Sequence, residues 1–588
     1  MGEIRLRELL SKKFVSIMKQ IKNDKEEYKT IKNIRIALLG DGSLQYFAMI
    51  LEYCLKISEI HADILLGTYN GLEMDVMDVG SEYNKFAPEI TIIFTSYRDV
   101  IYCPQITQKE DNLWNEVWRE IGKYEKIWTE IYNNHQSYIM QTNFVTPIER
   151  RLGNLEANYI WSEQTFLELL NYGLTVKRKP YVSILDFNYL AAVYGKEKWF
   201  DYSNYYLNKC NMAYDALPFA VEEVTLNILN YCGKSKKCIV LDLDNTIWGG
   251  VLEETGIDNL NIFPNDPVGE AFLAFQKYLK ALKERGVILA ICSKNDEEYA
   301  KKAFNLNHNM ILQLDDISCF VANWENKANN IQLIAQRLNI GLDAMVFIDD
   351  SPVERELVRT LIPEVEVLEL PEDPAYYMVE LEKAKYFEWL NITEDDTKRT
   401  DSYKAREQAQ ILLQNYDSYE KYLESLEMKI RAEDMTEISA SRTAQLFNKT
   451  NQFNTVRFRG TEAQIQNMQN NGDKVINYYL KDRFANYGMI SCAIVKIQLR
   501  EVVVEAWAMS CRVFKRTLEE YILNSFIKIA RDNSCEKIKI LYIPNERNRM
   551  IEEILSDRGF DKESGTNYYF LDIEQINNFK TYIKGEME

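Results

Sequence analysis

Two pairs of aspartates in this chain follow short apolar runs. Asp242 and Asp244 come after the run Cys238–Leu241, and Asp349–Asp350 follow the run 344–348. Such runs are typical of buried parallel strands, and open parallel sheets bind ligands at the carboxyl ends of their strands. Carboxylates gathered there repel one another unless a hard cation lies between them, and Mg²⁺ suits oxygen ligands. The spacing therefore predicts a divalent-cation site at one edge of a sheet.

A serine and a lysine belong to the same alternation of strands and helices. The apolar run 287–292 leads into Ser293, and Lys327 begins a segment with apolar residues at helical spacing. Residues 272–282 repeat at helical spacing and end at Gly286. This βαβ pattern predicts one parallel sheet whose loops carry two acid pairs, a hydroxyl and an ammonium group. The alternative, ordinary solvated loop residues, is disfavoured because all four sites occur in order.

The segment Asp242-Leu-Asp-Asn-Thr246 resembles motif I of the haloacid dehalogenase (HAD) superfamily, Asp-x-Asp-x-Thr. The resemblance implies phosphoryl transfer in which Asp242 is the nucleophile, through an aspartyl-phosphate, and Asp244 is the general acid and base. It also implies a set of cation and phosphate ligands. The expected Mg²⁺ ligands are Asp242, the Asp244 main-chain carbonyl, Asp349 and Asp350, and the expected phosphate-binding residues are Thr246, Ser293 and Lys327.

Four longer segments resemble the FkbH-like family of bacterial natural-product pathways. They are Asp242-Leu-Asp-Asn-Thr-Ile-Trp-Gly-Gly-Val-Leu252, Ile291-Cys-Ser-Lys-Asn-Asp296, Asn323-Trp-Glu-Asn-Lys327 and Phe347-Ile-Asp-Asp-Ser-Pro352. Asn326 stands where the familiar third motif has proline, and the resemblance extends through 442–453 and 509–512. It implies an enzyme that takes a phosphoglyceryl unit from 1,3-bisphosphoglycerate, removes its phosphate and loads D-glycerate onto the thiol of an acyl carrier protein.

Composition favours a large cytoplasmic enzyme. The 588 residues suggest about three or four domains, and 46% of them are hydrophobic. A net charge of −19 argues against nucleic acid as a partner, since a nucleic-acid binder needs a basic face. No apolar run approaches the length of a membrane span. Ten cysteines without a CxxC pair argue against a structural zinc site and indicate reduced thiols.

We expect a multidomain α/β protein with two parallel-sheet domains and a third α/β domain. The expected parts are an SGNH-hydrolase-like domain at 1–215, a HAD-like phosphatase domain at 216–375, a helical connector at 376–430 and a GNAT-like domain at 431–588. The first domain is expected to be degenerate. Its strand 34–39 leads to a small-residue turn with Ser43, where the SGNH fold has a nucleophile. A triad also needs a histidine near Asp186, and none is there, so Ser43 is predicted to cap a helix or form a turn.

The last domain resembles the GNAT acyltransferase fold in its order of elements. Helix 438–447, strands 474–480, 489–498 and 501–510, helix 518–529 and strand 537–542 are predicted. In that fold, a glycine-containing loop after the fourth strand holds the coenzyme A pyrophosphate. Here Arg512 is kept, but Lys515 and Thr517 replace glycines, so ordinary acetyl-CoA binding is not expected. Lys515 and Arg516 either meet the acidic surface of a carrier protein or are solvated cations.

The thioester chemistry that the resemblance implies needs a thiol. Cys511 ends the fourth strand, where a GNAT fold opens its central strands for the acyl donor, and the adjacent Arg512 would lower the pKa of its thiol. Cys511 is therefore the candidate acyl carrier, and the alternative is a small buried hydrophobe. Cys292 is expected to point away from the site by strand alternation. Asn451 either positions the substrate or belongs to a turn.

Two other functions remain open from the sequence. One is a plain Mg²⁺-dependent phosphatase that acts on a small metabolite. The other is a carrier-protein docking scaffold with a vestigial HAD site, which the four intact motifs disfavour.

Overall fold

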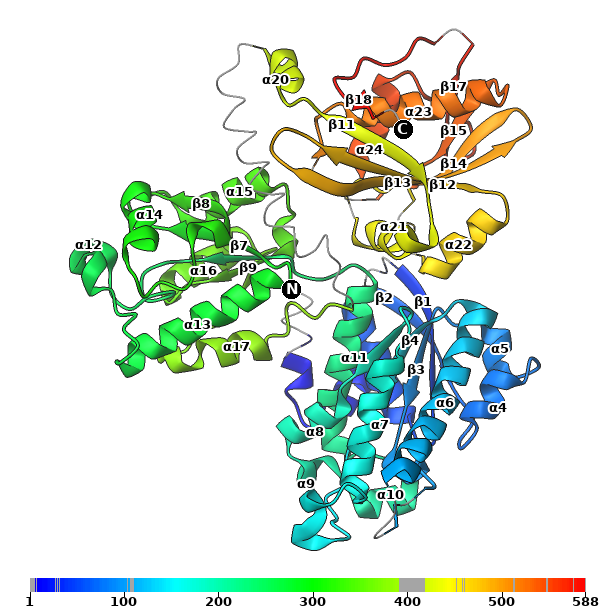
Figure 1. Cartoon of the computed structure of the whole chain (residues 1–588), viewed down its shortest axis with the longest axis vertical. Helices are drawn as coiled ribbons and strands as arrows, with labels where there is room; N and C mark the ends of the chain where they lie inside the picture. The colour runs from blue at the N-terminus through cyan, green and yellow to red at the C-terminus, as the bar shows by residue number, and fades with distance from the viewer. Residues whose placement is uncertain are drawn as a thin grey trace. The chain divides into compact units, whose positions relative to one another are not determined.

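The computed structural model describes most of the chain, in two units. The described residues are 6, 8–26, 28, 30, 32–102, 104–105, 110–390, 418–450, 452–456, 458, 460–510, 513–545, 548–574 and 576–586. The chain divides into two compact units, Met1–Leu229 and Asn230–Glu588 (Figure 1). The division expected at 215, 375 and 430 stays a prediction, and 391–417 of the expected connector lie outside the described residues.

The first unit is built on a five-stranded parallel sheet of order β2-β1-β3-β4-β5. Its strands are β1 (Lys32–Gly40), β2 (Ile60–Leu66), β3 (Ile90–Phe94), β4 (Tyr138–Thr142) and β5 (Val182–Leu185). Its helices are α2 (Phe14–Asn23), α3 (Gln45–Ile57), α4 (Leu72–Met77), α5 (Glu82–Phe86), α6 (Glu110–His135), α7 (Glu163–Lys177), α8 (Phe187–Tyr194), α9 (Lys196–Trp199), α10 (Tyr202–Asn208) and α11 (Leu217–Tyr231). Helices α6 and α7 pack their apolar residues on one face of the sheet. The strand order reverses between β1 and β3, where doubly wound folds bind ligands.

The second unit begins with another five-stranded parallel sheet, of order β10-β9-β6-β7-β8. Its strands are β6 (Cys238–Leu241), β7 (Ile288–Ser293), β8 (Ile317–Ala322), β9 (Met345–Ile348) and β10 (Glu366–Val367). Its helices are α12 (Leu252–Thr255), α13 (Pro267–Glu284), α14 (Glu297–Leu306), α15 (Lys327–Leu338), α16 (Pro352–Leu361) and α17 (Tyr377–Lys383). The three strands expected at the motifs are confirmed.

Strand alternation divides the core of this sheet between its two faces. Ile239 and Leu241 of β6 lie in one cluster with residues of α13, α14 and α17. Cys238 and Val240 lie in a second cluster with residues of α15 and α16. Helices thus cover both faces, and the apolar runs of β6, β7 and β9 are continuous because each residue is buried on one face or the other. Only the strand ends are left for polar chemistry.

A mixed eight-stranded sheet completes the second unit, in the order β16-β17-β15-β14-β13-β12-β11-β18. Its strands are β11 (Lys429–Asp434), β12 (Lys474–Lys481), β13 (Asn486–Gln498), β14 (Glu501–Met509), β15 (Lys537–Leu541), β16 (Asp561–Lys562), β17 (Tyr568–Asp572) and β18 (Lys584–Gly585). Its helices are α20 (Tyr419–Ser425), α21 (Glu437–Lys449), α22 (Glu462–Asn470), α23 (Leu518–Asp532) and α24 (Arg549–Asp557). Helices α23 and α24 pack on one face, and α21 and α22 pack on the other. The multidomain α/β class is confirmed.

Candidate functional site

The four sequence sites meet at the carboxyl edge of the sheet β10-β9-β6-β7-β8. Asp242 directly follows β6, Ser293 is the last residue of β7, and Asp349 directly follows β9. Lys327 is the first residue of α15, which follows β8. Because β9, β6 and β7 are neighbours with the same direction, their ends bring residues from distant parts of the chain into one cluster.

Helix α15 carries Lys327 into this cluster, and Asn326 fixes where the helix begins. Asn326 Oδ1 accepts a hydrogen bond from Ala328 N at 2.8 Å, which satisfies an amide that the first helical turn leaves without a partner. The residue that stands in place of the familiar proline is thus the helix cap. By fixing the start of α15, Asn326 fixes the position from which the Lys327 side chain extends.

Lys327 lies between two carboxylates. Its Nζ is 2.9 Å from Asp242 Oδ1 and 2.5 Å from Asp349 Oδ2, and all three residues are buried. Burial alone would lower the pKa of Lys327, but the charges of Asp242 and Asp349 raise it above its ordinary value. Burial and the charge of Asp242 raise the pKa of Asp349 to about 7, against the lowering effect of Lys327. One ammonium therefore compensates only part of the negative charge gathered here.

The carboxylates fit a divalent cation. One carboxylate oxygen from each of Asp242, Asp349 and Asp350 lies within 4.8 Å of the others. Asp242 Oδ1 is buried and accepts no hydrogen bond from the described residues, although Lys327 Nζ is close to it. Burial and the charge of Asp242 also raise the pKa of Asp350, which is the sign of an acid cluster that lacks enough positive charge. Hard oxygen ligands with excess negative charge suit Mg²⁺.

Asp244 faces the same edge from a tight loop. Its Oδ1 accepts hydrogen bonds from Trp248 Nε1 at 2.9 Å and Leu252 N at 3.1 Å, and its Oδ2 accepts one from Asn295 Nδ2 at 3.1 Å. Burial raises the pKa of Asp244, these three donors lower it, and the charge of Asp242 raises it. The sequence analysis missed Asn295. Asn295 lies within the segment Ile291–Asp296, two residues after Ser293, but was given no role of its own.

The two expected phosphate-binding hydroxyls differ in their surroundings. Ser293 is buried, and its Oγ lies 3.1 Å from Asn295 Nδ2 at the site. Thr246 is fully buried, and its Oγ1 accepts a hydrogen bond from Asp350 N at 3.2 Å. Thr246 therefore joins the loops after β6 and β9. A role for either hydroxyl in phosphate binding stays a prediction.

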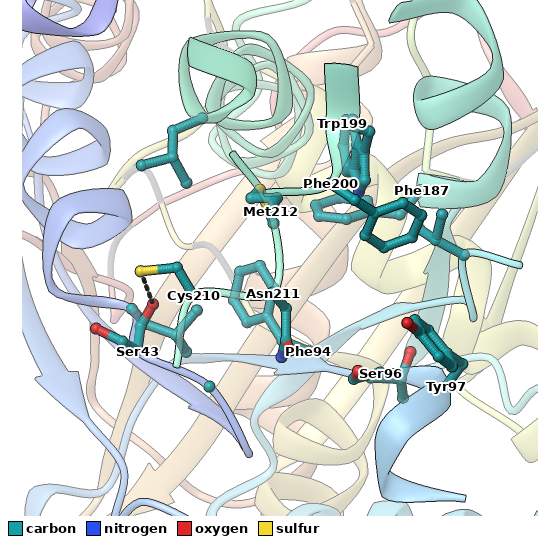
Figure 2. A pocket seen from close by; sticks show the side chains of 15 residues that line it. Ser43, Phe94, Ser96, Tyr97, Phe187, Trp199, Phe200, Cys210, Asn211 and Met212 are labelled. Carbon is teal, nitrogen blue, oxygen red and sulfur yellow. Dashed lines mark hydrogen bonds between the residues drawn. The ribbon is translucent and has the colours of Figure 1, made fainter. Parts of the chain in front are cut away.

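Ser43 lies beside a separate cavity of the first unit. The cavity encloses about 600 Å³ of empty space, part of it open to solvent, at the carboxyl ends of β1 and β3. Figure 2 shows Phe187, Trp199 and Phe200 on the side away from Ser43. No histidine is among the described residues that line it. Asp186 accepts hydrogen bonds from Tyr189 N and Asn143 Nδ2, so it caps α8.

The role predicted for Ser43 needs a correction. Helix α3 has Leu44 as its N-terminal cap, without a side-chain hydrogen bond. Ser43 Oγ pairs instead with Gln45 Oε1, and Ser43 N donates to Lys209 O. Helix capping is therefore wrong, because the hydroxyl meets a side chain rather than a free helix amide. The turn assignment holds.

In the last sheet, the opening between two central strands is filled by the chain itself. The parallel strands β14 and β15 pair only over Glu501–Val504 and Lys537–Ile540. Beyond that point, Phe453 O accepts from Met509 N at 2.9 Å, and Thr455 N donates to Trp507 O at 3.0 Å.

The same segment also reaches the other side of the opening. Thr455 O accepts from Ile543 N at 2.8 Å, just after β15. Asn548 Nδ2 donates to Asn454 O at 3.1 Å, and Phe453, Asn454 and Thr455 are fully buried. The segment 453–455 thus takes up the strand edge that a GNAT fold offers to its acyl donor.

The remaining predicted residues have different outcomes. Asn451, Cys511 and Arg512 lie outside the described residues. Lys515 is exposed. Arg516 is 5% exposed and its Nη1 lies 2.7 Å from the buried Asp482 Oδ2, so the idea that it meets a carrier protein is wrong.

The cysteines that the structure describes are all buried. They are Cys54, Cys210, Cys232, Cys238, Cys292, Cys319, Cys492 and Cys535. Cys292 lies in the core with α15, as strand alternation predicts, and burial raises the pKa of its thiol. None of these eight is placed to meet a carrier protein's thiol at the surface.

We expect coenzyme A not to bind this chain. Segment 453–455 occupies the strand edge that its pantetheine arm would use, and Lys515 and Thr517 stand at loop positions where glycine lets amides approach phosphates. Isothermal titration of the whole chain with coenzyme A should show no heat of binding. A dissociation constant in the micromolar range would contradict this arrangement.

We expect no cleavage of simple esters at Ser43, because no described histidine lines its cavity. Wild-type protein and Ser43→Ala should give the same background rate with p-nitrophenyl acetate. Esterase activity that disappears in Ser43→Ala would reveal a working nucleophile.

The buried pair of Asp482 and Arg516 should be important for stability. Asp482→Asn leaves Arg516 buried with an uncompensated charge and should cost about 3–5 kcal/mol. The nearby exposed pair of Lys481 and Glu586 is the control, and Glu586→Gln should cost far less stability than Asp482→Asn. Hydrogen exchange of the β12 and β13 amides measures the stability lost in each variant. Equal losses in the two variants would contradict this prediction.

Comparisons with known proteins find one matching family model and one similar phosphatase-containing structure. Residues 35–230 match the FkbH N-terminal domain. The solved N-terminal part of a Bacteroides fragilis protein, which contains a phosphatase domain and is complexed with Mg, is 34% identical, with a TM-score of 0.58. The match covers 65% of this chain and 100% of that chain.

The last sheet has weaker likenesses. The ribosomal-protein-S18-alanine N-acetyltransferase of Escherichia coli is 13% identical over 25% of this chain and 96% of that chain, with a TM-score of 0.20. A GNAT-family acetyltransferase of Staphylococcus aureus is 9% identical over 25% of this chain and 99% of that chain, also with a TM-score of 0.20. Scores this low carry no argument about activity.

No curated protein matches the chain. Each helix within the described ranges is too short or too polar to cross a bilayer. The match to the FkbH N-terminal domain and the full coverage of the 34% identical phosphatase structure agree with the motifs read from the sequence. This chain therefore belongs to the FkbH-like family.

Proposed function

We propose that this chain is a Mg²⁺-dependent phosphatase coupled to glyceryl transfer. It would take a phosphoglyceryl unit from 1,3-bisphosphoglycerate, remove the phosphate and load D-glycerate as a thioester on an acyl carrier protein. The observation that carries the phosphatase half is the buried cluster of Asp242, Lys327 and Asp349 at the strand ends. Membership of the FkbH-like family supports the transfer half.

The phosphatase step uses the chain's own groups as follows. A carboxylate oxygen of Asp242 attacks phosphorus, the bond from phosphorus to the substrate oxygen breaks, and Asp244 gives that oxygen its proton. Asp244 then takes a proton from water, whose oxygen displaces Asp242 from phosphorus and releases phosphate. Ser293 and Lys327 bind the phosphoryl oxygens by hydrogen bond and charge. Mg²⁺ bound by Asp242, Asp349 and Asp350 would neutralise the charge of these oxygens.

The transfer step needs a thiol, for which Cys511 is the proposed residue. A thiolate attacks the acyl carbon of 1,3-bisphosphoglycerate, the bond from that carbon to the phosphate oxygen breaks, and phosphate leaves a phosphoglyceryl thioester on the chain. The phosphatase site then removes the remaining phosphate. The carrier's phosphopantetheine thiol takes over the acyl group by thioester exchange. The burial of the eight described cysteines supports Cys511, because it makes those eight poor candidates.

Lys515 is the proposed contact with the acidic carrier protein. Its exposure supports this role. Asn451 and Arg512 remain candidates for the transfer site.

A plain Mg²⁺-dependent phosphatase is the second candidate. The specific observation in its favour is segment 453–455, which closes the strand opening that an acyl donor would use in a GNAT fold. A non-catalytic docking scaffold is disfavoured, because a buried cluster of unneutralised carboxylates is costly to keep without a bound cation or substrate.

Intact-mass analysis after mixing with 1,3-bisphosphoglycerate tests the proposal. Asp242→Asn keeps the side-chain volume but removes the nucleophile's charge, so it should abolish phosphate release from the phosphomonoester and trap a phosphoglyceryl adduct on the chain. Cys511→Ser should form no adduct and load no carrier. It should still dephosphorylate a phosphoglyceryl thioester supplied on the carrier.

The outcomes separate the candidates. Release of the phosphomonoester phosphate by Asp242→Asn at a near wild-type rate would rule out the aspartyl-phosphate mechanism. An adduct mapped to another cysteine would move the transfer site and keep the function. Hydrolysis without any adduct would favour the plain phosphatase.

A further inference from the structure

The two carboxylate oxygens of Asp244 are held in different ways. Oδ1 accepts two hydrogen bonds from fixed donors, Trp248 Nε1 at 2.9 Å and Leu252 N at 3.1 Å. A carboxylate oxygen has two lone pairs, and these two donors occupy both lone pairs of Oδ1. Oδ2 accepts one hydrogen bond among the described residues, from Asn295 Nδ2 at 3.1 Å. Oδ2 is therefore the oxygen with room for a proton.

Asn295 is built into the site rather than exposed beside it. It is 1% exposed, and its Nδ2 also lies 3.1 Å from Ser293 Oγ. In the carboxylate form of Asp244, Oδ2 only accepts hydrogen bonds, so the NH₂ group of Asn295 faces it. Its Oδ1 is buried and has no hydrogen-bond partner within the described part of the chain. One side chain thus links the acid to the hydroxyl at the end of β7.

The chain elements around Asn295 keep this side chain in place. Asn295 stands between the end of β7 and the start of α14, where Asp296 Oδ1 accepts a hydrogen bond from Tyr299 N at 2.8 Å. Because β7 ends just before Asn295 and the cap of α14 follows it, the main chain of Asn295 has little conformational freedom. Asp244 is held equally firmly from the opposite side by the buried indole of Trp248.

We propose that Asn295 is a positioning residue that makes Oδ2 of Asp244 the oxygen that exchanges protons with the substrate. This inference rests on the proposed phosphatase function. As the bond from phosphorus to the leaving oxygen breaks, the proton on Oδ2 moves to the leaving oxygen, and Asp244 becomes a carboxylate. In the second half, Oδ2 takes a proton from the water whose oxygen attacks phosphorus. Asn295 touches neither phosphorus nor the leaving oxygen.

Loss of Asn295 should then matter most when the leaving group needs a proton. An alkyl oxygen leaves as an alcohol and depends on the acid, whereas a p-nitrophenyl oxygen leaves readily as an anion. The quantity kcat/KM reports the steps up to the first irreversible one, which includes transfer to Asp242, so it isolates the step in which Asp244 is the acid. A merely structural role would reduce kcat/KM for both kinds of substrate alike.

The experiment compares 3-phosphoglycerate with p-nitrophenyl phosphate, both with Mg²⁺ and the full chain. Asn295→Ala, and Asn295→Asp, which has similar size but no N–H donor, should lose about 30-fold or more in kcat/KM with the alkyl ester. Each should lose less than about threefold with the aryl ester. Trp248→Phe keeps a buried ring but frees one lone pair of Oδ1, and should show the same selectivity with a smaller loss.

Asn307→Ala is the matched control. Asn307 follows the last residue of α14, and its Nδ2 donates to the main-chain Ile257 O at 3.0 Å rather than to Asp244 or Ser293. This variant should keep both activities. Equal losses with the two esters in the Asn295 variants, or no loss with either, would overturn the inference. Wild-type protein that hydrolyses neither ester would instead contradict the proposed phosphatase function.

Discussion

The charge balance around Lys327 is the constraint on which the site depends. A buried ammonium between Asp242 and Asp349 would be costly without both partners, and the carboxylates would be costly without it. One positive charge against Asp242, Asp349 and Asp350 still leaves the cluster negative. Burial, together with the charge of Asp242, raises the pKa values of Asp349 and Asp350. Lys327 thus reduces the repulsion among the three aspartates, and the remaining negative charge still favours binding of a cation.

The fold makes this balance possible by confining polarity to strand ends. Both faces of the sheet β10-β9-β6-β7-β8 are covered by helices, so its strands are apolar along their length. The cap at Asn326 and the hydrogen bond from Asp350 N to Thr246 then fix the loops that leave the sheet. The positions of the acidic side chains are therefore set mainly by the main chain of the strands and loops, and less by contacts among the acids.

Much of this arrangement could be predicted from local sequence, because strands β6, β7 and β9 are apolar runs that end in acids or serine. Strand β4 is hard to predict, because Gln141 and Thr142 end its short apolar run Tyr138–Met140, and both are buried in the fold. The role of Asn295 could not be recognised from the sequence, because it depends on the position of Asp244 in the fold and not on the residues next to Asn295 in the chain. Segment 453–455 likewise becomes a strand partner only through contacts with distant residues.

The central claim is that Asp242, Asp349 and Asp350 bind a divalent cation beside a nucleophilic carboxylate. A crystal structure of the chain grown with Mg²⁺ and beryllium trifluoride, a mimic of a bound phosphoryl group, tests it most directly. The account predicts the trifluoride attached to an oxygen of Asp242, with Mg²⁺ bound by the three carboxylates and with Lys327 and Ser293 against the fluorides. A cation bound elsewhere, or a trifluoride that does not touch Asp242, would contradict it.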